Sequence, residues 1–145
     1  MKTSKAGITA IEAREGVRLK AYRDTKGILT IGVGHTSAAG DPSVRAGMCI
    51  THDECDTILS RDLADCEAAV NSAVKIKITQ GEFDALVSLA FNIGTGGFVK
   101  SSVVKRLNAG DRKGAAAAIM MWNKPPEIIG RRTSEMRQFA ANAPK

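Results

Sequence analysis

Apolar side chains recur at helical spacing in the middle of the chain. The spacings are four, three, four and four residues, at Leu59, Leu63, Cys66, Val70 and Val74. This pattern predicts one helix over about residues 52–75, and the preceding Thr51-His-Asp-Glu54 is a capping box that would start it. Such a helix would extend roughly 36 Å at about 1.5 Å per residue, long enough to connect two lobes.

A second capping box, Thr79-Gln-Gly-Glu82, precedes the most apolar segment of the sequence. The residues that follow it form a broad apolar face, with Phe83, Leu86, Val87, Ala90 and Phe91. We expect a central core helix here that ends at the glycines after residue 93.

Shorter helices are predicted toward the C-terminus. Ser101 or Ser102 can cap a helix that reaches residue 109, and Asp111 can cap another that continues to Trp122. Pro125-Pro126 would break that helix, and residues 131–141 would form a terminal one.

The N-terminal third combines a helix with strands. Residues 4–15 read as a helix, residues 21–35 as a small hairpin sheet with glycines at its turns, and residues 36–50 as a loop. Together these elements predict a mostly helical α+β fold. At 145 residues the chain is long enough for one domain with a sound core.

Composition and charge narrow the function classes. The net charge of +6 and the pI near 9.5 predict attraction to anionic surfaces. The basic residues are dispersed, which argues against nucleic acid as a partner. No apolar run approaches the roughly 18 residues that span a membrane, and no signal-peptide core is present, so we expect neither stable membrane insertion nor self-export.

Cofactors are not expected either. The three cysteines are odd in number and lack the spacing of a zinc site. We therefore interpret them as reduced thiols of a protein that is made in a cytosol. The chain has two histidines and no HExxH pattern, which predicts no metal site. Gly32 and Gly34 do not begin a nucleotide-binding loop, because Ser37 stands where the third glycine would be.

Glu15 is the first candidate for chemistry. It follows Ile8 at i+7 and Ile11 at i+4, so on a helix it would extend the apolar stripe, and Gly16 follows as a C-cap would. Burial and the negative end of the helix dipole would both raise the pKa of its carboxyl, as a general acid requires. The alternative is an ordinary ion pair with Arg18.

Asp24 and Thr30 are the second and third candidates. Arg23 and Lys26 flank Asp24 in a polar turn and would keep it ionised, while Thr30 lies in a strand-like segment beside it. Two carboxyls with opposite surroundings match the division of roles in glycosidic bond cleavage. Asp24 alone could equally be a turn residue.

The segment from Glu15 to His35 resembles the phage lysozymes of glycoside hydrolase family 24, the T4 and lambdoid endolysins. Their motif, a Glu, a spacer, Tyr-x-Asp, a turn and Thr-x-Gly-x-Gly-His, appears with its spacing kept at Glu15, Tyr22, Asp24, Thr30, Gly32, Gly34 and His35. The similarity continues in residues 79–98, at Trp122 and in Gly130-Arg131-Arg132, and so covers nearly the whole chain.

The resemblance implies a lysozyme-like single domain over residues 1–145. A β lobe over about residues 16–50 and a helical lobe over about residues 76–145, packed with helix 4–15, would be joined by the long helix 52–75, with the active-site cleft between the lobes. The implied activity is that of an endolysin muramidase, which hydrolyses the β-1,4 bond between N-acetylmuramic acid and N-acetylglucosamine in peptidoglycan for host-cell lysis.

The resemblance also implies roles for individual residues. Glu15 would be the general acid, and Asp24 with Thr30 would position a water, with inversion favoured and a carboxyl separation of roughly 6.5–9.5 Å. Thr36 and Phe98 would contact the saccharide, although Phe98 could equally belong to the core.

Contacts are also predicted for three further side chains. Arg131 or Arg132 would reach Glu15, or else form a solvated pair at a helix start. His35 is predicted to be structural, tied to the long helix through Asp62 or Asp65.

The expected partners follow from these roles. They are peptidoglycan and a separate holin-like protein that permeabilises the membrane, since a monomer made in the host cytoplasm would need such help to reach the wall. Two alternatives stay open: a lytic transglycosylase, which needs one Glu and forms anhydro ends, and a non-catalytic cationic wall-binding protein.

Overall fold

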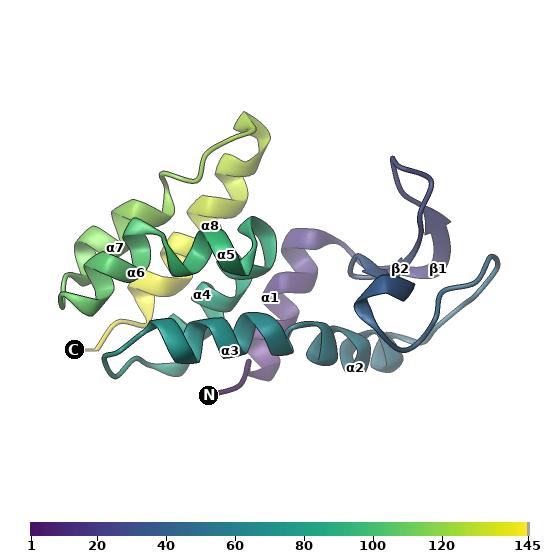
Figure 1. Cartoon of the computed structure of the whole chain (residues 1–145), viewed down its shortest axis with the longest axis horizontal. Coiled ribbons are helices and arrows are strands. Elements are labelled where there is room, and N and C mark those ends of the chain that lie inside the picture. The colour runs from purple at the N-terminus through teal and green to yellow at the C-terminus, as the bar shows by residue number, and fades with distance from the viewer. Residues whose placement is uncertain (145) are drawn as a thin grey trace. The chain divides into compact units, whose positions relative to one another are not determined.

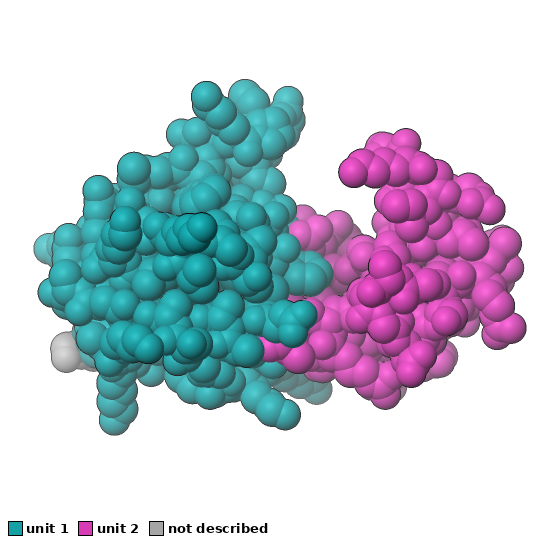
Figure 2. Space-filling view, in the orientation of Figure 1, with its two compact units in different colours: residues 1–7, 65–145 teal, residues 8–64 magenta. Residues whose placement is uncertain are grey.

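The computed structural model describes residues 1–144 and divides into two compact units. One unit comprises residues 8–64, and the other comprises residues 1–7 and 65–144 (Figure 2). The N-terminal helix, predicted over residues 4–15, is therefore divided between the units and does not belong to the helical one alone.

The unit of residues 8–64 carries the sheet and two helices (Figure 1). Its elements are most of α1 (Lys5–Glu15), β1 (Arg18–Arg23), β2 (Leu29–Gly32), β3 (His35–Thr36), a 3₁₀ turn (Ser37–Ala39) and α2 (His52–Asp62). The predicted hairpin is thus a three-stranded antiparallel sheet in the order β1-β2-β3. The segment between the 3₁₀ turn and α2 has little regular structure, as expected.

The register of the sheet decides which side chains share a face. Tyr22 pairs with Thr30, and Thr30 pairs with Thr36 on the other side. Directly opposed residues of antiparallel strands project to the same face, so these three form one row. Ile31 and His35 pair in the next position and project to the opposite face, which is buried.

The buried face of the sheet packs against α2. Ile31 is fully buried, and Leu59 of α2 is 1% exposed. Gly32 has a φ of +67°, and a β-carbon there would lie 3.3 Å from the Cys55 sulfur of α2. Only glycine combines this backbone conformation with so close an approach.

The second unit is helical. It contains all but the first residue of α3 (Ala64–Ala73), together with α4 (Gln80–Ile93), α5 (Thr95–Val99), α6 (Ser102–Asn108), α7 (Arg112–Ile119), a 3₁₀ turn (Pro126–Ile128) and α8 (Ile129–Ala141). Helix α4 is its core, because every residue from Glu82 to Ala90 is buried. Helix α8 packs along α4 and α7, and α6 packs against α7 (Figure 1).

The predicted caps of α4, α6 and α7 are confirmed, whereas α8 begins at Ile129, two residues before its predicted start. The Thr79 hydroxyl accepts from the Glu82 amide, and the Glu82 carboxylate accepts from the Thr79 amide, which is the full capping box. Ser101 caps α6 and Asp111 caps α7 with a single side-chain bond each, in which the side-chain oxygen accepts from the Val104 and the Gly114 amide respectively. Helix α7 ends at Ile119, short of the predicted end at Trp122.

The prediction of a single helix over residues 52–75 is wrong, because the structure has two helices there. The capping box at Thr51 starts α2 as predicted, but α2 ends at Asp62 and α3 begins at Ala64. At Leu63 the backbone flattens to ψ −8°, and its amide bonds to the carbonyls of both Leu59 and Arg61. Leu63 is thus a turn residue between the two helices, and the division between the two units falls one residue later, after Ala64.

The structure also tests the expectations about the cysteines and about membrane-spanning helices. All three cysteines are free thiols, as predicted. Among residues 1–144, none of the helices combines the length and the apolar character that crossing a bilayer requires.

Candidate active site

Asp24 lies in the turn that joins β1 to β2. Its Oδ1 accepts from the amides of Lys26 (2.8 Å) and Ile28 (2.9 Å), while its own amide donates to the Ile28 carbonyl at 2.9 Å. The turn interpretation of Asp24 is therefore correct. It does not exhaust the side chain, because Oδ2 has no hydrogen-bond partner among residues 1–144.

Thr30 lies in the central strand, on the same face as Tyr22 and Thr36. Thr30 is 3% exposed, and its hydroxyl donates to the Ile28 carbonyl at 2.9 Å. Asp24 follows Tyr22 by two residues but lies in the turn after β1 ends at Arg23, so its side chain is positioned by its bonds to the Lys26 and Ile28 amides. Since the Thr30 proton is committed to Ile28, its oxygen is left as an acceptor.

Tyr22 at one end of this row is fixed by Arg18. The Arg18 guanidinium lies 4.3 Å from the centre of the Tyr22 ring, a cation–π contact. Thr36, at the other end, is half-buried in β3.

Glu15 is the last residue of α1, followed by Gly16 with a φ of +83°. The Gly16 amide donates to the Glu12 carbonyl at 2.8 Å, so the predicted helix end with a glycine cap is confirmed. The predicted burial is wrong, because Glu15 is exposed. The acid that the apolar stripe buries is Glu12, which lies one turn after Ile8.

His35 is structural in its contacts, as predicted. Its ring is buried, with Nδ1 2.7 Å from Asp62 Oδ2 and Nε2 2.8 Å from the Pro42 carbonyl. The carbonyl can only accept, so Nε2 carries a hydrogen and donates it. The pair ties β3 to the C-terminal end of α2, and of the two predicted partners Asp62 is the correct one.

Arg131 and Arg132 converge on Glu135. Arg131 Nε donates to Glu135 Oε2 at 3.1 Å, and Arg132 Nη1 donates to Oε1 at 2.7 Å. Ser88 of α4 donates to Oε2 at 2.6 Å. Glu135 is fully buried, so the alternative of a solvated arginine pair is wrong. A bond from either arginine to Glu15 stays a prediction.

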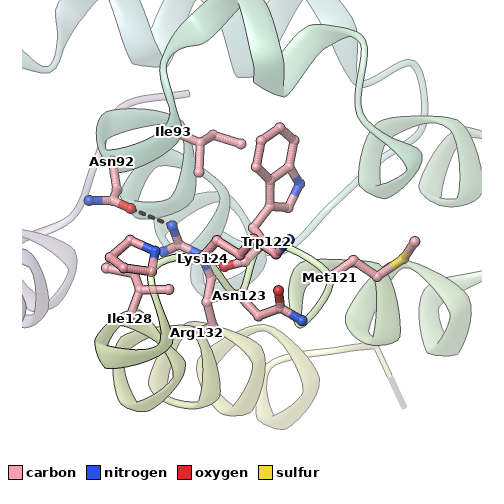
Figure 3. Close-up of a pocket in the computed structure, with 9 residues that line it drawn as sticks. Asn92, Ile93, Met121, Trp122, Asn123, Lys124, Ile128 and Arg132 are labelled. Atoms are coloured by element: carbon pink, nitrogen blue, oxygen red, sulfur yellow. Dashed lines mark hydrogen bonds between the residues drawn. The ribbon is translucent and has the colours of Figure 1, made fainter.

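A cavity of about 580 Å³ lies beside Arg132 (Figure 3). It is lined by the indole of Trp122, Ile93, Met121, Lys124 and neighbouring residues. Arg132 anchors the wall, because it donates to the Trp122 carbonyl at 2.8 Å and to the Asn92 side chain. Met121 and Trp122, which follow α7, thus form part of the wall of a surface cavity.

Phe98 is corrected from a saccharide contact to a core residue. Its side chain is fully buried in the described structure, where it can pack but cannot meet a ligand. For a single aromatic residue after a glycine-rich turn, the sequence does not distinguish a core position from a saccharide contact.

Comparison with known proteins is consistent with this geometry. The family model described as "Phage lysozyme" matches residues 12–135. The endolysin of Salmonella phage P22 is 42% identical over 143 residues, covering 96% of this chain and 98% of that protein.

Solved structures agree in fold. A crystal structure of a P22 lysozyme mutant has a TM-score of 0.90 at 41% identity, covering 97% of this chain and 99% of the other. The muramidase domain of SpmX from Asticaccaulis excentricus has a TM-score of 0.83 at 37% identity, covering 95% and 97%.

These matches define the class as lysozyme-like glycoside hydrolases, mostly helical with a small three-stranded sheet. Within that class, the chain belongs to the phage lysozyme family. It is an endolysin-type enzyme of cell-wall lysis.

Proposed function

We propose that this lysozyme hydrolyses the β-1,4 bond between N-acetylmuramic acid and N-acetylglucosamine with Glu15 as general acid and with Asp24 and Thr30 holding the water. The observation that carries the proposal is the divided use of the Asp24 carboxylate. Oδ1 is fixed by two backbone amides, and Oδ2 has no partner among residues 1–144. A carboxylate fixed at one oxygen and open at the other is oriented before substrate arrives.

Glu15 supplies the proton to the leaving glycosidic oxygen. Its exposure leaves the carboxyl accessible to a saccharide, and the Gly16 cap fixes the backbone that carries it. When the C–O bond breaks, the departing sugar keeps this proton as its new hydroxyl, and Glu15 is left as a carboxylate.

The water would donate one hydrogen to Asp24 Oδ2 and the other to Thr30 Oγ1. Both atoms are acceptors, since Asp24 is a carboxylate and the Thr30 proton is directed to the Ile28 carbonyl. A water held in this way presents a lone pair to the anomeric carbon. As the oxygen attacks, Asp24 accepts its proton, which is the base role of an inverting glycosidase.

Thr36 extends the same face of the sheet and is proposed to contact the saccharide. The substrate partner is peptidoglycan, toward which a net charge of +6 gives long-range attraction. We also propose that the enzyme is a monomer made in the host cytoplasm. It would reach the wall after a separate protein has permeabilised the membrane.

Product analysis tests the reaction type. Mass spectrometry of digested peptidoglycan should find reducing-end muramic acid, and NMR during early turnover should find the α-anomer first. The alternative reaction, lytic transglycosylation, would instead give 1,6-anhydro ends. A first-formed β-anomer would overturn the water-activating role of Asp24, because retention requires a covalent or equivalent intermediate.

A further inference from the structure

Three potential metal ligands meet inside the unit of residues 8–64. Glu12 comes from the last turns of α1, and His52 and Asp56 come from the first two turns of α2. The two α2 residues are four apart, so they share one face of that helix. His52 Nε2 lies 3.4 Å from Glu12 Oε2 and 3.8 Å from Asp56 Oδ1, and all three ligand atoms lie within 4.8 Å of one another.

These separations suit a shared cation better than direct hydrogen bonds. Zinc binds nitrogen and oxygen ligands at about 2.0–2.2 Å, which in a tetrahedral site puts the ligand atoms roughly 3.4 Å apart. An N–H···O hydrogen bond is shorter, at about 2.9 Å. A small side-chain rotation would therefore bring the three atoms around one ion.

One oxygen atom of the cluster is unsatisfied. Asp56 Oδ1 is shielded from solvent and has no hydrogen-bond partner in the described structure. The Glu12 side chain is only 9% exposed, and besides His52 its Oε2 is approached by the Cys55 thiol, which donates to it at 4.0 Å.

A buried carboxylate such as that of Glu12 is ordinarily paired or coordinated to a metal. We propose that Glu12, His52 and Asp56 bind one divalent transition-metal ion of the zinc class. An imidazole and two carboxylates suit such ions, and the two negative charges neutralise the ion. The remaining coordination position is open to water, since the His52 side chain is 61% exposed.

The bound ion would join the end of α1 to the start of α2. Two further acids in the first turn of α2, Asp53 and Glu54, offset the positive end of that helix, which would otherwise disfavour a cation. The expectation of no metal site came from the absence of HExxH. It overlooked His52 and Asp56 as an i, i+4 pair, and Glu12 is forty residues before His52 in the sequence.

The proposal is independent of the catalytic assignment, because none of its three ligands has a proposed role in glycoside cleavage. Isothermal titration of the metal-free full-length chain with ZnCl₂ tests it, together with the thermal unfolding midpoint. The expected result is saturable binding of one ion per chain and a higher Tm with zinc than without.

The variants His52→Gln and Asp56→Asn should each weaken zinc binding by more than about tenfold, the least that loss of even an outer-shell partner usually costs. Both side chains are substantially exposed, at 61% and 40%, so the fold should survive. Asp41→Asn, an exposed acid of the same unit outside the cluster, is the control, and Cys49→Ser excludes binding through the exposed thiol. Absence of saturable binding, or binding unchanged in His52→Gln, would overturn the proposal.

Discussion

Asp24 uses its two carboxylate oxygens for two different tasks. One oxygen closes the turn between β1 and β2 by accepting from two amides. The other, in our proposal, accepts from the attacking water. Fold and catalysis therefore depend on the same residue and can be separated by the choice of substitution.

Asp24→Asn should retain the turn and lose the reaction. An amide oxygen can still accept from the Lys26 and Ile28 amides, but it cannot take a proton from water. We expect lysis to fall by at least about a hundredfold with an unfolding free energy within about 0.5 kcal/mol of wild type. Asp24→Ala should lose both bonds and cost about 1–3 kcal/mol as well.

Turbidity assays and urea unfolding measure these two effects. Asp41→Asn, another acid of the same unit, is the control and should change neither quantity. Wild-type lysis by Asp24→Asn would remove Asp24 from the mechanism.

Sequence spacing identified the end of α1 but chose the wrong acid for burial. By its spacing in the sequence, Glu15 continues the apolar stripe of Ile8 and Ile11. It is nevertheless the final residue of the helix, and the chain changes direction at Gly16. Glu12, at i+4 from Ile8, is the position that the packing covers. Which part of an apolar stripe is covered depends on the partner element, and periodicity alone does not contain that information.

At the level of elements, the capping boxes were the most reliable sequence signal. Thr51 and Thr79 both form the reciprocal bonds that the spacing predicts. The interaction closes within four residues, so tertiary context has little to alter. The interruption at Leu63 carries no such local signal, since no glycine or proline is nearby.

Thr79→Ala should destabilise the protein by about 1–2 kcal/mol. The substitution removes the cap of the core helix α4, and also the hydroxyl that donates to the Asn142 carbonyl at 2.7 Å. Thr57→Ala is the matched control, because the exposed Thr57 hydroxyl only bonds back to Asp53 within α2. Equal stability of the two variants in chemical denaturation would show that the cap contributes nothing.

Helix α8 is attached to α4 through a buried ionic cluster. Arg132 and Arg131 both donate to Glu135, and Ser88 of α4 donates to the same carboxylate. The i+3 and i+4 spacings of Glu135 were visible in the sequence, but the burial of the cluster was not.

Arg132→Met should cost about 3–5 kcal/mol, because it leaves part of a buried carboxylate without its partner. Arg137→Met, an exposed position of the same helix, should cost less than about 0.5 kcal/mol. Thermal and urea unfolding measure both. A small effect at Arg132 would mean that water replaces the lost guanidinium.

The stability of the whole molecule should depend on Cys66 at alkaline pH. Burial, and then the neighbouring Asp65 and Glu67, raise the pKa of this thiol from 9.0 to about 11. The folded state thus favours the protonated thiol. Its contribution is fully present below pH 9 and is lost as pH rises from 9 to about 11.

Cys66→Ala removes this pH dependence. The difference in unfolding free energy between wild type and Cys66→Ala should therefore shrink by roughly 2 kcal/mol from pH 8 to pH 11. Comparing the two proteins cancels the titration of lysines and tyrosine. A difference that stays constant across this range would contradict the raised pKa.

The family was recognisable from sequence because its motifs are short, separated and in a fixed order. The division of the chain after residue 64 was not, because it arises from contacts between distant segments. The Glu12, His52 and Asp56 cluster is likewise a product of tertiary structure. Local chemistry was thus predictable from the sequence, and long-range proximity required the structure.

The most direct test of the central claim is the lysis rate of Glu15→Gln on permeabilised Gram-negative cells, followed by turbidity. The variant keeps the shape of the side chain and removes its proton donor, so we predict a loss of at least about a hundredfold with unchanged Tm. Glu127→Gln, an exposed acid of the other unit, should lyse cells like wild type. Lysis by Glu15→Gln at a rate close to wild type would contradict the account.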